Sequence, residues 1–279
     1  MIRLDHVSKR YPNGREALSD LSLEIAAGEI AFLTGHSGAG KSSLLKLIAL
    51  IERPSRGQLI VNGQNVAGVS RSRIPAFRRR IGMVFQDHKL LHDRTIYDNV
   101  ALPLIVAGVG GKEIGRRVRA ALDQVGLLGR EQSVPLELST GEQQRVGIAR
   151  AVVSKPPLLI ADEPTGNLDP DLSLEVMNIF RRFNEVGVTV LVASHDLFLL
   201  EHFPVRRIRL EGGRLAGDAP AQATARDPSP TTAPEDLGRE DAVRGRGPWT
   251  DPEPTPAGSA RANLLDPRKL IEQNEGMAP

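Results

Sequence analysis

The chain has 279 residues, 40% of them hydrophobic and 25% charged, which is enough to bury one large core or one core with an appended subdomain. It contains no cysteine, which excludes disulfides and thiolate metal sites. The net charge of +2 is too small to indicate a nucleic-acid-binding protein, so we expect no nucleic acid among its partners. No apolar run approaches the roughly 20 residues that span a bilayer, and the N-terminal segment lacks the apolar core of a signal peptide. We therefore expect a cytoplasmic protein that reaches a membrane only through a partner.

Short alternating runs near the N-terminus predict three strands, at residues 2–7, 21–25 and 58–63. The continuous apolar run EIAFLTG at 29–35 predicts a buried strand, and it leads into a helix at 41–50. The domain is therefore expected to begin with strands at its edge and to contain an early junction between a buried strand and a helix.

The sequence GHSGAGKS at 35–42 lies at this junction and fits the phosphate-binding pattern G-x-x-x-x-G-K-[ST]. The backbone N–H groups of such a loop curl around phosphate oxygens, and the helix N-terminus adds its positive end. We expect Lys41 to reach the β- and γ-phosphates and the Ser42 hydroxyl to bind Mg²⁺. The residues expected to touch the nucleotide here are Gly35, His36, Ser37, Gly38, Ala39, Gly40, Lys41, Ser42 and Ser43.

A helical insertion is predicted near residues 90–155. Its clearest helix, at 111–127, has one apolar face, made of Ile114, Val118, Ala121, Leu122 and Val125.

Another helix of this insertion begins within LSTGEQQRVGIARA at 138–151. Ser139 and Glu142 stand three residues apart, as in a capping box, and the free N–H groups of a helix start can also bind an anion. Thr140 lies between them, and a β-branched residue resists positive φ. Either this position needs only ordinary dihedral angles, or the helix start is a weakened anion site.

Two apolar runs, at 157–164 and 188–196, predict buried strands of a parallel sheet. Asp162 ends the first run and is placed to bind Mg²⁺, while Glu163 could orient or deprotonate an attacking water. His195 ends the second run. By itself, a lone histidine after a strand more often makes a structural hydrogen bond.

The last predicted element of the domain is a hairpin at 205–215 with a Gly-Gly turn. After residue 217 the composition changes, because 218–279 holds ten of the 20 prolines and carries a net charge of −4. We expect an ATPase domain at 1–217 and a Pro-rich disordered tail at 218–279. Asp266 followed by Pro267 could begin a short helix there, although a frayed terminus is the simpler explanation of the segment.

Six motifs follow one another in the chain: GHSGAGKS, VFQ, LSTGE, LLIADE, GNLD and VASHD. In this order they resemble the ATP-binding cassette (ABC) ATPases, and the resemblance covers residues 1 to about 217. It implies an α/β fold, an ABC-type P-loop NTPase with a RecA-like core, an N-terminal antiparallel β subdomain and an α-helical subdomain. It also implies a head-to-tail homodimer with ATP and Mg²⁺ at the interface.

The same resemblance implies roles for individual residues. Ser139, Gly141 and Glu142 would face the γ-phosphate bound to the other subunit, although Thr140 departs from the glycine that is usual between them. Gln86 would touch Mg²⁺ or the lytic water, and His195 the γ-phosphate. Two further residues would act at the nucleotide, with Asp169 crossing the dimer interface and Tyr11 stacking on adenine. An ordinary aromatic at the end of a strand remains the alternative for Tyr11. The implied catalytic residues are Lys41, Glu163 and His195, and the implied magnesium ligands are Ser42, Gln86 and Asp162.

Within the family, the sequence DHKLLHDRT…DNVALPL in residues 78–104 resembles that of the FtsE group of cell-division cassettes. That group implies a subunit at the cytoplasmic face of the inner membrane, held there by an integral membrane protein resembling FtsX and acting in cell division and cell-wall hydrolase control. The alternative is the nucleotide-binding subunit of a lipoprotein-release or macrolide-type exporter. The arginines of 71–80 are expected to form a solvated helix face rather than a nucleic-acid patch.

Overall fold

A six-stranded sheet passes through the centre of the computed structural model, which describes residues 1–221. Its strands, in spatial order, are β10 (Arg214–Ala219), β9 (Arg206–Glu211), β3 (Ile30–Thr34), β8 (Thr189–Ala193), β7 (Leu158–Asp162) and β6 (Ile81–Val84). All neighbouring pairs are parallel except β9 and β10, which form the predicted hairpin. The strands predicted from apolar runs are confirmed, whereas β6 was not predicted because its four residues follow three arginines.

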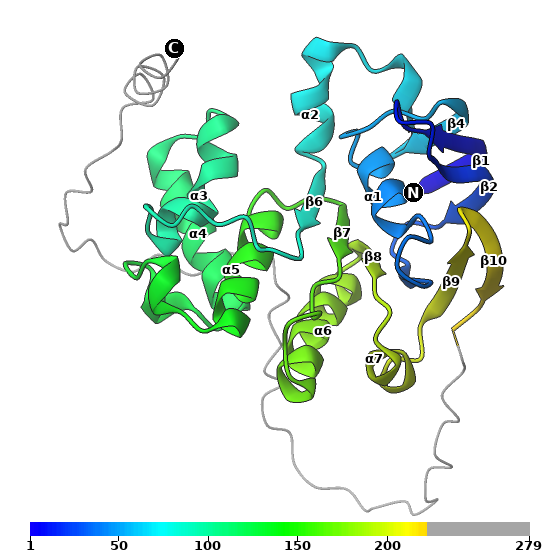
Figure 1. Ribbon diagram of the computed structural model, residues 1–279. Coiled ribbons are helices and arrows are strands. Elements are labelled where there is room, and N and C mark those ends of the chain that lie inside the picture. Colours follow the sequence, from blue (N-terminus) through cyan, green and yellow to red (C-terminus); the bar gives the residue numbers. More distant parts are fainter. Residues whose placement is uncertain (222–279) are drawn as a thin grey trace, which may run out of the picture.

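The second sheet confirms the strands predicted near the N-terminus and adds a short edge strand. Its spatial order is β2 (Glu16–Ile25), β1 (Ile2–Arg10), β4 (Arg56–Val61) and β5 (Gln64–Asn65), and every pair is antiparallel. Figure 1 shows this sheet on one side of the central sheet and most of the helices on the other side.

Three helices make the predicted insertion: α3 (Ile96–Val106), α4 (Gly111–Gln124) and α5 (Thr140–Val152). The predicted apolar face of α4 is confirmed, since its members from Ile114 to Leu122 are buried and Val125, just beyond the helix, is buried too. The remaining helices are α1 (Lys41–Ile48), α2 (Ile74–Arg78), α6 (Pro170–Glu185) and α7 (Leu197–His202). Within residues 1–221, no helix is both long enough and apolar enough to cross a membrane.

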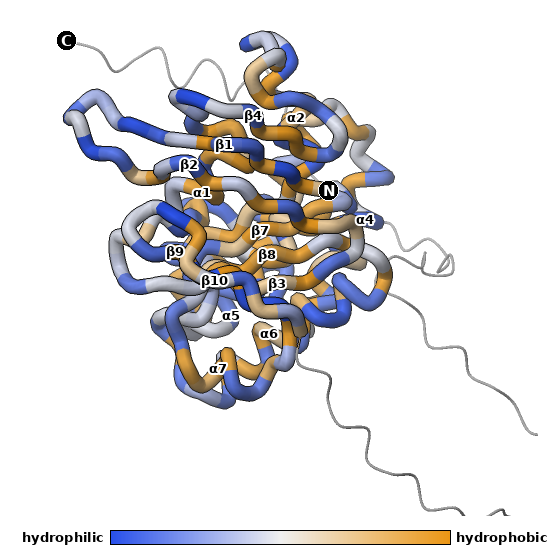
Figure 2. The backbone as a smooth tube through the Cα atoms, turned by 90° about the vertical axis from the view of Figure 1, so that its right-hand side faces the viewer, coloured by the Kyte–Doolittle hydropathy of each residue, from blue (hydrophilic) through white to orange (hydrophobic). Residues whose placement is uncertain are grey.

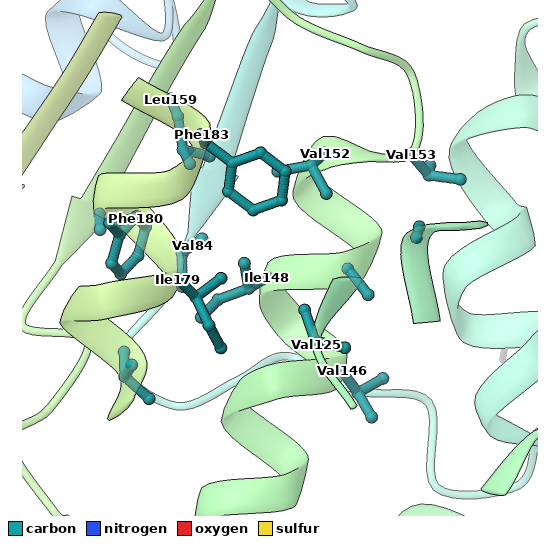
Figure 3. Close-up of a cluster of buried hydrophobic side chains, with 14 of the residues drawn as sticks. Val84, Val125, Val146, Ile148, Val152, Val153, Leu159, Ile179, Phe180 and Phe183 are labelled. Atoms are coloured by element: carbon teal, nitrogen blue, oxygen red, sulfur yellow. The ribbon is translucent and has the colours of Figure 1, made fainter. Parts of the chain in front are cut away.

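The central strands are buried on both faces, which explains why they are continuously apolar (Figure 2). In β7, Leu159 and Ala161 face the core formed with α5 and α6, while Leu158 and Ile160 face the core formed with α1 and the antiparallel sheet. Figure 3 shows the first of these cores, where Phe180 and Phe183 of α6 lie with side chains from α5 and the sheet. The central sheet is therefore packed between two hydrophobic cores, which fix the positions of its strand ends.

The capping box at the start of α5 is confirmed. The Ser139 hydroxyl accepts from the Glu142 N–H at 3.3 Å, and the Glu142 carboxylate accepts from the Ser139 N–H at 2.9 Å. These contacts lower the pKa of Glu142. Thr140 is the first helical residue and lies outside the set of residues with positive φ, so this position needs only ordinary dihedral angles.

The predicted boundary at residue 217 needs a small correction. Strand β10 continues to Ala219, and Asp218 accepts two hydrogen bonds from the Arg206 guanidinium, both at 2.7 Å. The predicted short helix at Asp266 lies outside the described residues.

The first prediction compares a chain that ends at residue 221 with one that ends at 217. The shorter chain loses Asp218, and because the ion pair is bidentate but partly exposed, we expect its free energy of unfolding to fall by about 1 kcal/mol. Arg206 holds the pKa of the Asp218 carboxyl below its ordinary value of 3.8, so this stabilisation is present above that pH and is lost as the pH falls through the lowered value. Urea titrations at pH 7 and pH 3 measure both effects. Equal stability of the two chains at pH 7 would contradict the assignment of Asp218 to the fold.

The second prediction concerns Thr140→Gly. Glycine has no advantage at a position with helical dihedral angles and loses more conformational entropy on folding, so we expect the free energy of unfolding to fall by about 0.3 kcal/mol, the difference between the helix propensities of threonine and glycine. Urea unfolding monitored by circular dichroism measures it. An increase in stability would mean that threonine is strained there.

Candidate nucleotide-binding site

The loop between β3 and α1 is held in a conformation that requires glycine. Gly35 and Gly40 have φ of 142° and 108°. A Cβ atom would lie 2.3 Å from the Leu210 carbonyl oxygen at Gly35 and 2.6 Å from the Ala17 carbonyl oxygen at Gly40, so the neighbouring strands leave no room for one. The loop therefore packs backbone against backbone and opens into the start of α1.

A cavity of about 510 Å³ lies over this loop. Its walls come from the loop, from the start of the antiparallel sheet and from the ends of the central strands. The lining residues are Tyr11, Arg15, Ser37, Gly38, Ala39, Gly40, Lys41, Ser42, Ser43, Lys46, Gln86, Glu163 and His195. Gly35 and His36 belong to the same loop but are not among these residues.

The structure brings the three predicted catalytic side chains together. The Lys41 ammonium is buried, donates to the Gly35 carbonyl oxygen at 2.7 Å and lies 3.4 Å from Glu163 Oε1. The other carboxylate oxygen of Glu163 lies 2.8 Å from His195 Nδ1. Glu163 itself has a φ of 50°, so the chain turns sharply after β7 and aims this carboxylate into the cavity.

The residues predicted to bind magnesium fit a hard divalent cation. The Ser42 hydroxyl donates to Asp162 Oδ1 at 3.1 Å. Ser42 and Gln86 line the cavity, whereas Asp162 lies behind Ser42 and is not among the lining residues. Burial raises the pKa of Asp162, and the neighbouring charge of Glu163 adds to this effect. A half-buried carboxylate hydrogen bonded to a hydroxyl, with an amide side chain in the lining of the cavity, offers the oxygen ligands that Mg²⁺ prefers.

Tyr11 lines the cavity, with its hydroxyl 3.2 Å from Ser43 Oγ. The Lys9 ammonium lies 4.9 Å from the centre of the ring. These contacts fix the ring and are compatible both with stacking on a base and with a structural role.

The remaining predicted residues lie outside the cavity. Ser139, Gly141 and Glu142 begin α5, and the Asp169 carboxylate caps α6 by accepting from the Leu172 N–H at 3.0 Å. The two helix starts are in contact, because a Cβ atom on Gly141 would lie 3.1 Å from Leu172. This part of the surface is separate from the chain's own phosphate loop.

Arg15 and Lys46 line the cavity although the sequence analysis did not select them. Lys46 follows Ser42 by about one helical turn, so helical periodicity would have placed it near the loop. Arg15 had no such local signal, since only the approach of the first hairpin to the loop brings it there.

Comparison with known proteins agrees with this geometry. Residues 18–166 match the family model described as "ABC transporter". The chain is 57% identical over 217 residues to the cell division ATP-binding protein FtsE of Escherichia coli K12, covering 78% of this chain and 98% of that protein. It is 46% identical to FtsE of Mycobacterium tuberculosis and 44% identical to FtsE of Streptococcus pneumoniae, in each case over 78% of this chain and 95% of the relative.

Solved structures give the same result. A dimeric structure of the bacterial ABC transporter cassette MJ0796 has a TM-score of 0.73 and 33% identity, over 80% of this chain and all of that one. A second dimeric structure of MJ0796, in a post-hydrolysis state with ADP and phosphate, has a TM-score of 0.73 and 32% identity over the same shares. The phosphate loop, the converging catalytic side chains and these matches lead to one conclusion: the chain is an ATPase of the ABC transporter family and belongs to its FtsE group.

Proposed function

We propose that this chain is the ATP-hydrolysing subunit of an FtsE–FtsX type of complex, which acts on an integral membrane partner during cell division. The observation that carries the proposal is the convergence of Lys41, Glu163 and His195 on a cavity walled by the phosphate loop. The identities of 44–57% to proteins named FtsE support the cell-division assignment and do not favour an exporter. On this proposal the subunit lies at the cytoplasmic face of the membrane and is held there by its partner.

The phosphate loop binds the triphosphate of ATP through its N–H groups. Lys41 exchanges its carbonyl contacts for the β- and γ-phosphate oxygens, which offer a stronger negative charge. Ser42, Asp162 and Gln86 would hold Mg²⁺, which would neutralise part of the phosphate charge. Tyr11 stacks on the adenine ring.

Glu163 and His195 act on the attacking water. The Glu163 carboxylate orients the water and takes its proton while the water oxygen attacks the γ-phosphorus, giving ADP and phosphate. His195 holds Glu163 through the contact at Nδ1 and contacts the γ-phosphate. The site acts mainly by positioning groups and by stabilising charge.

A second copy of the chain completes each site. Ser139, Gly141, Glu142 and Asp169 lie away from the chain's own cavity and present N–H-rich helix starts, which suit the γ-phosphate held by another subunit. The dimeric structures of MJ0796 support a homodimer, and the head-to-tail arrangement is part of this proposal.

The membrane partner docks beside the helical insertion. A second cavity, of about 380 Å³, lies between the start of β6, the end of α3 and α5, and its lining includes Arg78, Arg79, Arg150, Met83 and Val106. Val106 is 68% exposed, so it offers apolar contact area to a helix from another protein. The ATPase domain corresponds to residues 1–219, that is, the predicted 1–217 with the last two residues of β10, and 220–279 is an addition to it.

The third prediction is that Glu163→Gln binds ATP and dimerises but barely turns it over. The phosphate loop is untouched, whereas the group that takes the proton is lost, so kcat should fall by about 10²–10⁴-fold. Phosphate release, nucleotide affinity and size-exclusion chromatography measure the three properties. Glu185→Gln, on the exposed side of α6, is the matched control and should keep the wild-type rate. Wild-type turnover by Glu163→Gln would remove Glu163 from the mechanism.

The fourth prediction is that Val106→Asp weakens binding of an FtsX-type membrane protein. Removing one valine contact that is buried in the complex weakens binding by about 1.5–3 kcal/mol, which lowers the affinity by roughly 10–100-fold. Copurification of the membrane protein with the tagged chain measures this. Leu197→Asp, at a leucine that is 72% exposed on α7, is the control. If both variants copurify equally little membrane protein, or if neither differs from wild type, the docking surface lies elsewhere.

A further inference from the structure

The turn that follows Gln86 contains two successive non-glycine residues with left-handed backbone. His88 has a φ of 57° and Lys89 a φ of 50°. Such a conformation costs about 1–2 kcal/mol for each residue, so contacts from elsewhere must hold it. Gln86 lies just before this turn and lines the nucleotide cavity, so its position depends on what holds the turn.

Helix α5 supplies these contacts, from residues far along the chain. The Arg150 guanidinium donates to the carbonyl oxygens of both His88 and Lys89, the second at 2.6 Å. His88 Nδ1 is hydrogen bonded to Gln144 Oε1. Two side chains of α5 therefore hold His88 and Lys89. Arg150 binds both backbone carbonyl oxygens, and Gln144 binds the His88 side chain.

Packing alone does not account for Gln144. Its side chain is 1% exposed, and its Nε2 atom has no hydrogen-bond partner in the described part of the chain. A buried unpaired amide costs about 1–3 kcal/mol, so an apolar residue of similar size would suit the core better. The bond from Oε1 to His88 is the contact that only a polar residue could make here.

We propose that Gln144 and Arg150 are positioning residues for Gln86. By holding the turn at 87–89 against α5, they make Gln86 move together with that helix. The start of α5 carries Ser139, so one displacement of α5 changes Gln86 in its own site and Ser139 at the neighbouring subunit's site. This inference rests on the proposed role of Gln86 in hydrolysis.

The decisive variant is Gln144→Met in the full chain. Methionine fills a similar volume and removes the unpaired Nε2, so the melting temperature should not fall, whereas the link to His88 is lost. Because a small misplacement of a positioned group slows catalysis strongly, we expect kcat for ATP hydrolysis to fall by about tenfold, with KM for ATP changed by less than about twofold. A purely structural role would instead change the melting temperature and the rate together.

A second pair of variants tests the same link from the other side. His88→Ala removes the hydrogen bond and should lower kcat by a similar factor. His88→Asn should restore most of the rate, because asparagine tolerates left-handed backbone and its amide nitrogen can donate near the position of Nδ1. Failure of asparagine to recover more activity than alanine would count against the link.

Arg182→Ala is the matched control. The Arg182 guanidinium also donates to a backbone carbonyl, that of Gln124 at 3.0 Å, and so joins α6 to the end of α4 rather than to the turn after Gln86. We expect it to keep the wild-type kcat. If Gln144→Met keeps the wild-type kcat while Gln86→Ala is slow, the inference is overturned and the proposed function stands. If Gln86→Ala itself is as fast as wild type, the proposed role of Gln86 fails and the inference fails with it.

Discussion

Burial of the Lys41 ammonium is the constraint on which the nucleotide site depends. A buried positive charge is stable only when oxygen atoms surround it, and here they come from the loop carbonyls and the Glu163 carboxylate. The loop can present those carbonyls because Gly35 and Gly40 allow its backbone to touch β9 and β2. The phosphate loop, the hairpin that covers it and the turn after β7 are thus parts of one packing arrangement.

The parallel sheet explains why the other active groups lie beside Lys41. Strands β3, β6, β7 and β8 run in the same direction, so their carboxyl ends meet at one edge. The phosphate loop follows β3, Gln86 follows β6, Glu163 follows β7 and His195 comes just after β8. Residues from four separate stretches of sequence reach one cavity because two cores hold these strands in fixed register.

Helix α5 connects this site to the rest of the molecule. Its start is a capped helix terminus that lies outside the chain's own cavity, while Gln144 in its second turn and Arg150 in its last turn hold the turn after Gln86. A helix is stiff along its axis, so its start and the residues that hold this turn shift together. In a head-to-tail dimer of the proposed kind, this stiffness would tie the two nucleotide sites to each other and to the docking surface.

The sequence by itself determined the features that strong local patterns encode. The phosphate loop, the buried strands, the apolar face of α4 and the capping box at Ser139 were all predicted correctly, because neighbouring residues specify them. Only the tertiary structure decided the rest. Strand β6 exists because β7 pairs with it, Arg15 reaches the cavity because the first hairpin folds over the loop, and Asp218 joins β10 because Arg206 binds it. The contact between His88 and Gln144 joins residues 56 positions apart, and no local pattern predicts which of two distant polar side chains will meet in a packed core.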